Sequence, residues 1–99
     1  MNAIEMYVAE IQAAAQARYD ALKYTIPAPV YSISTGKRFH KVIEKSSMSG
    51  TSGSVHCFVD IATGDIYKPA SWNAPAKGIR GNLQDAKKPL LCGDFYRYQ

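Results

Sequence analysis

Apolar residues near the start of the chain recur at the three- and four-residue spacing of a helix. They are Ile4, Val8, Ile11, Ala15, Tyr19 and Leu22. Asn2, followed three residues later by Glu5, resembles a capping box, and the alanine-rich middle favours the same state. The pattern predicts an amphipathic helix over about residues 3–23, which must end before Pro27 because proline cannot continue the hydrogen-bond ladder. We expect this helix to bury its apolar face against a sheet or a partner subunit.

From Val30 onward the hydrophobic period changes to two, which is typical of strands. Residues 30–35 and 38–45 alternate on either side of a Gly-Lys turn and predict a hairpin. Residues 55–61 have the clearest strand pattern, in which two sets of side chains face opposite ways. One set is Val55, Cys57, Val59 and Ile61; the other is His56, Phe58 and Asp60. After a turn, residues 66–68 predict a fourth strand, which Pro69 ends or confines to an edge.

Together these patterns predict a single α+β domain spanning residues 1–99. The N-terminal amphipathic helix packs on an antiparallel sheet of about four strands in meander order, over about residues 30–69. An irregular basic aromatic loop and a C-terminal segment follow over residues 70–99. Small polar residues at 46–54 predict a mobile connection within the sheet, which either orders on a ligand or has no function of its own. Residues 90–98 either add a strand or pack as an irregular tail.

Composition and charge narrow the range of partners. The chain is 46% hydrophobic and 20% charged, as in an ordinary globular protein. Its net charge of +4 is uneven, because residues 1–22 carry −2 and leave +6 for residues 23–99. Such an excess attracts polyanions, chiefly nucleic acid or an anionic membrane surface. We expect no membrane partner, since no apolar run approaches the roughly 18 residues of a span and the N-terminus lacks the basic start of a signal peptide.

Residues that carry catalytic or metal chemistry are sparse. Cys57 and Cys92 are far apart and belong to no metal-ligand spacing, so we expect reduced thiols and no structural zinc. The pattern favours a buried strand position for Cys57 and leaves Cys92 open. His40 and His56 lie on predicted strands, which favours surface or half-buried histidines over a general base. No nucleophile or metalloprotease motif is present and the carboxylates are scattered, so we expect neither enzyme activity nor a metal or organic cofactor.

Residues 67–82 combine the only tryptophan of the chain, Trp72, with three cations, two prolines and two glycines. The prolines and glycines predict a shaped loop, not a long helix or a central strand. The cations could contact phosphates, and the rings of Tyr67 and Trp72 could stack on unpaired bases, which are the two ingredients of single-stranded nucleic-acid binding. The alternative is a loop whose Trp72 fills the core.

The second predicted strand is rich in cations, which a core strand would not tolerate. We expect the face shared by Arg38, His40, Val42 and Glu44 to meet solvent or phosphate, with further lysines close by. Aromatic residues alternate with these cations, as in sheets that stack bases while basic side chains follow the backbone. They are Tyr31, Phe39, Phe58, Tyr67 and Trp72. The alternative is that the rings form cross-strand pairs in a core and the lysines discourage edge aggregation.

The run from Phe58 to Asn82, with the signature TGDIYK-x-ASW-x-APAKGIRGN, resembles small proteins of tailed bacteriophages, most of them without assigned activity. In size and element order the chain is also similar to phage RNA-binding proteins with a Whirly-like fold, whose curved sheets oligomerise and hold single-stranded nucleic acid. These resemblances imply binding roles for Trp72, Lys77 and Arg80 and a place in the cytoplasm of an infected bacterial host. The chain departs from the Whirly-like pattern in having little room for two C-terminal helices.

The sequence therefore predicts a non-enzymatic protein that binds single-stranded nucleic acid, RNA more than DNA, with low sequence specificity. Tyr67 and Trp72 would stack on bases, and Asn82 would hydrogen-bond a base edge. The residues expected to contact phosphates are Lys37, Arg38, Lys41, Lys68, Lys77 and Arg80. The alternative hypotheses are an interaction module that inhibits or redirects a host protein, with the helix and Trp72 as anchors, and a virion component. The apolar C-terminus and the alanine-rich helix face also predict a homo-oligomer.

Overall fold

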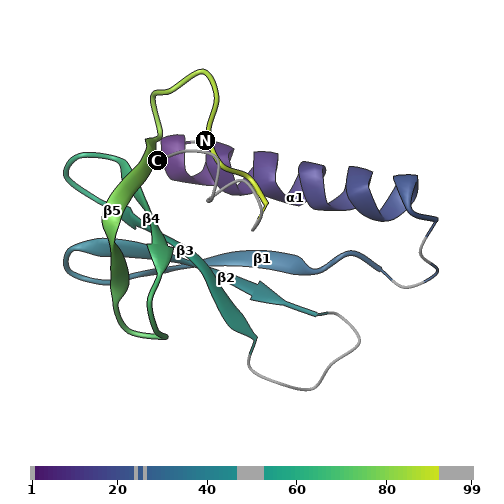
Figure 1. Cartoon of the computed structure of the whole chain (residues 1–99), viewed down its shortest axis with the longest axis horizontal. Coiled ribbons are helices and arrows are strands. Elements are labelled where there is room, and N and C mark those ends of the chain that lie inside the picture. Colours follow the sequence, from purple (N-terminus) through teal and green to yellow (C-terminus); the bar gives the residue numbers. More distant parts are fainter. Residues whose placement is uncertain (1, 24, 26, 47–52, 92–99) are drawn as a thin grey trace.

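The computed structural model describes residues 2–23, 25, 27–46 and 53–91. In these ranges the chain forms one helix and five strands: α1 (Ala3–Ala21), β1 (Val30–Thr35), β2 (Phe39–Lys45), β3 (Ser54–Asp60), β4 (Asp65–Pro69) and β5 (Pro75–Asn82). The strands make one antiparallel sheet in the order β1-β2-β3-β4-β5. The helix lies across one face of this sheet (Figure 1). The predicted α+β meander is confirmed, with one strand more than expected.

Local sequence signals set the limits of α1. The Asn2 side chain accepts a hydrogen bond from the Glu5 backbone N–H at 3.0 Å, and the Glu5 carboxylate accepts one from the Asn2 N–H at 3.1 Å. This capping box satisfies N–H groups that have no partner inside the helix. The helix ends two residues earlier than predicted, because Lys23 adopts a left-handed backbone with φ of 56°.

The core lies between α1 and the sheet. Ile11, Val42, Cys57, Val59 and Ile66 are fully buried there. The predicted burial of Cys57 is confirmed, because none of its surface is exposed.

Tyr7 is a core residue that the helical pattern did not identify. Only 1% of its surface is exposed, and its hydroxyl donates a hydrogen bond to the backbone carbonyl of Pro89. The segment after β5 is thereby held against α1, and its residues Leu83, Leu90 and Leu91 pack on the core. In Figure 1 this segment arches beside the N-terminal end of the helix.

A bulge in β3 changes the direction of His56. The register between β2 and β3 shifts after Val42, which leaves His56 as an extra residue on β3. Its ring is 3% exposed, lies 5.2 Å from the Tyr31 ring in an edge-on arrangement, and donates from Nε2 to the Leu90 carbonyl at 2.7 Å. The prediction that His56 lies at or near the surface on the side of Phe58 is therefore wrong, because a period of two does not continue through a bulge.

The expected loop at residues 70–99 contains a strand. Eight residues of β5 run beside five of β4 through two register shifts, and Gly78 has a φ of 98° at one of them. The glycines are compatible with a strand because they lie at bulges. A proline is compatible with the first position of an edge strand because the sheet needs no N–H donor there. Prolines and glycines therefore indicated a loop where the chain forms a bulged edge strand, and the turn between β4 and β5 spans only residues 70–74.

Three expectations concern residues outside the described ranges. Most of the predicted mobile connection (47–52), Cys92, and the greater part of the proposed last strand or tail (92–98) are among them. In the ranges that are described, no helix has the length and apolar character needed to cross a membrane.

Candidate nucleic-acid interface

The sheet face opposite α1, here called the open face, carries a cluster of rings. Phe39, Phe58 and Tyr67 come from three adjacent strands, and the neighbouring residues Cys57, Val59 and Ile66 on β3 and β4 face the core. The Phe39 ring lies 5.9 Å from Phe58 and 5.8 Å from Tyr67, in each case nearly perpendicular. Such edge-to-face contacts are favourable beyond the area they bury. Phe58 is buried beneath this cluster, and Phe39 and Tyr67 remain half-exposed.

The turn between β4 and β5 brings Trp72 to this face. Hydrogen bonds from the Ala70 and Ser71 N–H groups to the Ala74 carbonyl, at 3.0 and 3.1 Å, close the turn. The ammonium of Lys41 then lies 4.6 Å from the Trp72 ring centroid and 5.9 Å from that of Phe58. Trp72 is 43% exposed, so the alternative in which it fills the core is wrong.

Arg38 continues the cationic part of the open face. Its guanidinium lies 5.0 Å from the Phe39 ring centroid, and its Nε lies 3.5 Å from the Asp60 carboxylate. The backbone N–H of Thr63 holds the pKa of Asp60 below its usual range against the opposing effect of desolvation, with help from the Ala62 N–H and Arg38. Asp60 is therefore ionised at neutral pH and forms an ion pair with Arg38, whose side chain is 74% exposed. We call Arg38, Phe39, Lys41, Phe58, Tyr67 and Trp72 the aromatic-cation surface.

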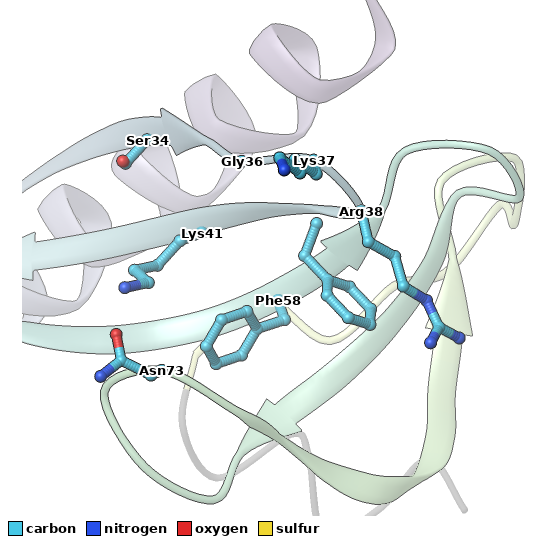
Figure 2. A pocket seen from close by; sticks show the side chains of 8 residues that line it. Ser34, Gly36, Lys37, Arg38, Lys41, Phe58 and Asn73 are labelled. Atoms are coloured by element: carbon cyan, nitrogen blue, oxygen red, sulfur yellow. The ribbon is translucent and has the colours of Figure 1, made fainter.

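Two depressions adjoin this surface. The first, of about 240 Å³, lies between the β1–β2 turn and the β4–β5 turn. It is lined by Ser34, Gly36, Lys37, Arg38, Phe39, Lys41, Phe58 and Asn73. Figure 2 shows the labelled side chains on the side of the sheet away from the helix, with Asn73 contributed by the turn. Trp72 helps to line the second depression, of about 310 Å³, and Lys41, whose ammonium lies over the Trp72 ring, lines the first.

Five of the nine predicted site residues lie on or beside the aromatic-cation surface. They are Lys37, Arg38, Lys41, Tyr67 and Trp72. Lys68 follows Tyr67 on β4, so strand alternation directs it to the other face. Lys77 is exposed and Arg80 is half-buried on the edge strand β5.

The side chain of Asn82 is occupied by a turn. Its amide donates to the Thr63 carbonyl at 2.9 Å and to the Asp65 carboxylate at 3.0 Å, and its oxygen accepts from the Gln84 N–H at 2.9 Å. These bonds join the start of β4 to the end of β5. The predicted contact of Asn82 with a base edge would require breaking them.

The face expected to meet solvent through Val42 and Glu44 is in fact the covered one, because Val42 is fully buried. Glu44 accepts a hydrogen bond from the Tyr31 hydroxyl at 3.0 Å and lies 3.7 Å from Nδ1 of His56. The proximity of the His56 ring is the main cause that lowers the pKa of Glu44, opposed by desolvation and aided by the Tyr31 hydroxyl. The cations of β2 that face outward are on the opposite side, with Lys41 directly across from Phe58.

Sequence reasoning counted Phe39 and Phe58 among the rings of a base-stacking sheet but gave them no contact role, and it did not identify Asn73. Phe58 carried a signal in its alternation with core residues, but its position beneath Lys41 depends on the pairing of β2 with β3. Asn73 carried no signal, because its place beside the depression depends on how the β4–β5 turn folds. Among the residues described, no three or more histidine, cysteine or acidic side chains gather as a metal site.

Comparison with other proteins places the chain in a family. No curated protein and no solved structure matches it. The model of a protein family of unknown function, DUF7717, matches residues 1–94. This match spans α1, the whole sheet and the segment that follows β5. The chain therefore belongs to the family of unknown function DUF7717.

Proposed function

We propose that this protein binds single-stranded nucleic acid along the open face of its sheet, with little sequence specificity. The observation that supports this most directly is the Lys41 ammonium, which lies against both the exposed Trp72 ring and the Phe58 ring. A cation and an accessible planar ring at one place can contact a phosphate and an unstacked base of the same nucleotide. The preference for RNA over DNA rests on the resemblance to phage RNA-binding proteins.

The electrostatic character of the first depression favours an anionic ligand. Lys37, Arg38 and Lys41 line it, and none of its lining residues is acidic. Asp60, the nearby carboxylate, is paired with Arg38. A strand that follows the two depressions would therefore place phosphates beside three cations.

Stacking on Trp72 supplies the sequence-tolerant part of the affinity. Base stacking on an aromatic side chain contributes about 1–3 kcal/mol per base. The Trp72 ring is accessible, while Phe39 and Tyr67 expose part of their surfaces. The aromatic-cation surface can thus hold a short strand without reading its base edges.

The direct test is a fluorescence polarisation titration of labelled single-stranded RNA at about 50 and about 200 mM salt. We expect binding at the lower concentration that weakens as salt is added. Because Trp72 is the only tryptophan, intrinsic fluorescence reports stacking at this position, and we expect it to be quenched. Absence of binding at low salt would contradict the proposal.

Matched variants distinguish binding at the aromatic-cation surface from binding that depends only on the net positive charge of the protein. Lys41→Gln and Arg38→Gln remove cations from the aromatic-cation surface, whereas Lys87→Gln and Arg18→Gln remove exposed cations elsewhere. We expect only the first pair to weaken binding strongly, and Trp72→Ala to weaken it about 5- to 150-fold. If all four charge variants weakened binding equally, binding would depend on the net charge of the protein and not on the aromatic-cation surface.

A second proposal concerns a host protein as the partner. Trp72 and Ile79 are exposed large apolar residues in the β4–β5 hairpin, and such residues anchor protein interfaces. Capture of a partner from bacterial lysate after nuclease treatment, lost with Trp72→Ala, would favour this function over nucleic-acid binding. An origin in tailed phages, the cytoplasm of an infected host and a Whirly-like likeness stay predictions from the sequence resemblance.

A further inference from the structure

The outer edge of β1 carries backbone groups that β2 does not pair. In the described chain β1 is an edge strand with β2 as its neighbour. At the hairpin turn the Gly36 N–H donates to the Phe39 carbonyl at 3.0 Å, so the even-numbered residues exchange hydrogen bonds with β2. The N–H and C=O groups of Ile33 and Thr35 therefore point outward.

The helix covers the beginning of the β1 edge and leaves the rest of that edge uncovered. The Gln12 side chain accepts from the Tyr31 N–H at 3.0 Å and donates to the Pro29 carbonyl at 2.7 Å. Its amide thus takes the place that a neighbouring strand would have. Ile33 and Thr35, farther along β1, have no such side chain on their outward groups among the described residues.

The two edges of the sheet differ in protection. Exposed edges in natural sheets are usually interrupted by charges, prolines or bulges that prevent pairing with another chain. The β5 edge has all three, including Pro75, Lys77 and the bulge at Gly78. The β1 strand, VYSIST, has neither charge nor proline and pairs with β2 in an unbroken register.

We propose that β1 pairs with β1 of a second copy of this chain, antiparallel and about a twofold axis at Ser34. In this register Ile33 of each copy exchanges hydrogen bonds with Thr35 of the other, which uses both uncovered residues. A register centred on Ile33 would require the Tyr31 N–H that Gln12 holds. Because β1 itself has no charged residue, no like charges lie directly opposite each other in the paired strands, and no charge on β1 selects a different strand.

This pairing would join the open faces of the two copies. Ser34 lines the first depression, so the depressions of both copies would flank the axis. The dimer itself does not depend on nucleic acid, and its tests are made without it. A failed pairing test therefore leaves the proposed binding function to be judged separately.

The first test is the mass of the protein in solution, measured by light scattering over a wide concentration range. We expect a concentration-dependent dimer for the native chain. Ser34→Lys places two lysines opposite each other and should leave a monomer. Ser32→Lys adds the same charge to an exposed serine of the same strand, but lies away from the axis and should still dimerise.

The second test is a disulfide crosslink between the two copies, which forms only if the folded chains pair and so cannot be explained by unfolding of the variant. With Cys92 replaced by serine and Cys57 buried, Ser34→Cys should form an intermolecular disulfide on mild oxidation. The two Cα atoms would be about 4.5 Å apart, within the range of a disulfide. Ser32→Cys is the control, because its two copies would be roughly 13 Å apart. A monomer at every concentration, or a dimer that Ser34→Lys leaves intact and Ser34→Cys does not crosslink, would overturn the proposal.

Discussion

The ammonium of Lys41 lies 4.6 Å from the ring centroid of Trp72, although β3 lies between β2 and β4, the strand from which the β4–β5 turn begins. The contact therefore brings the turn over the open face. It joins the cation-rich strand β2 to the exposed tryptophan, and these two features are far apart in the sequence.

Replacing Lys41 by methionine should separate charge from packing. Methionine keeps an unbranched apolar side chain near Phe58 but removes the ammonium. Cation–π contacts at exposed sites contribute about 0.5–1 kcal/mol, so we expect a small loss of stability and a changed Trp72 emission spectrum. Urea denaturation and intrinsic fluorescence measure the two effects. An unchanged spectrum would show that Lys41 and Trp72 are not in contact in solution.

The ionised Glu44 should support folding above its ordinary pKa of 4.5. Its pKa is lower in the folded protein, because the His56 ring lies close to the carboxylate and the Tyr31 hydroxyl donates a hydrogen bond to it. The folded state therefore binds protons less readily, and this stabilisation is lost as the pH falls through the folded pKa.

Urea denaturation from pH 7 down through this acidic range measures the effect. Glu44→Gln should flatten the loss of stability on acidification, and Asp60→Asn should do the same because the pKa of Asp60 is also lowered. Asp20→Asn, on the exposed surface of α1, controls for removing one negative charge. An acid dependence in Glu44→Gln as steep as that of the native chain would contradict the role of Glu44.

The Tyr7 hydroxyl should stabilise the segment after β5. In Tyr7→Phe the buried Pro89 carbonyl loses its hydrogen bond, which costs about 1–3 kcal/mol. Equilibrium unfolding in urea measures this cost, and hydrogen exchange should increase in residues 83–91. Met6→Ala changes a side chain that is 53% exposed on the same helix and should alter stability by about 0.5 kcal/mol or less. Equal stabilities of Tyr7→Phe and the native chain would count against this contact.

Gly81 should resist replacement because Pro89 approaches it closely. A Cβ at Gly81 would lie 2.9 Å from Cδ of Pro89, whose ring cannot turn away. We expect Gly81→Ala to cost about 1–3 kcal/mol in urea denaturation, as overpacking usually does. Gly36→Ala is the matched control, since its new Cβ would meet its nearest atom at 3.6 Å. Similar small losses in both variants would show that residues 83–91 do not press on β5.

Much of the fold follows from signals that neighbouring residues provide. The capping box of Asn2 and Glu5 and the helical spacing of Ile4 and Ile11 locate α1 within two residues of its end. Alternation locates β1 to β4, because each pattern reports a face that is either buried or exposed. The candidate site was identified only in part. Lys41 and Trp72 were predicted members, but their contact requires the sheet order and the folded turn.

What the sequence determined by itself was the type of each strongly periodic element and the supply of cations and rings. Tertiary structure decided that residues 75–82 form a bulged strand, that His56 is buried beside Tyr31 and that Asn82 closes a turn. The physical reason is the range of the interactions. Helix caps and alternating patterns act among residues close in the chain, whereas bulges, edge pairing and ring contacts arise only when distant strands come together.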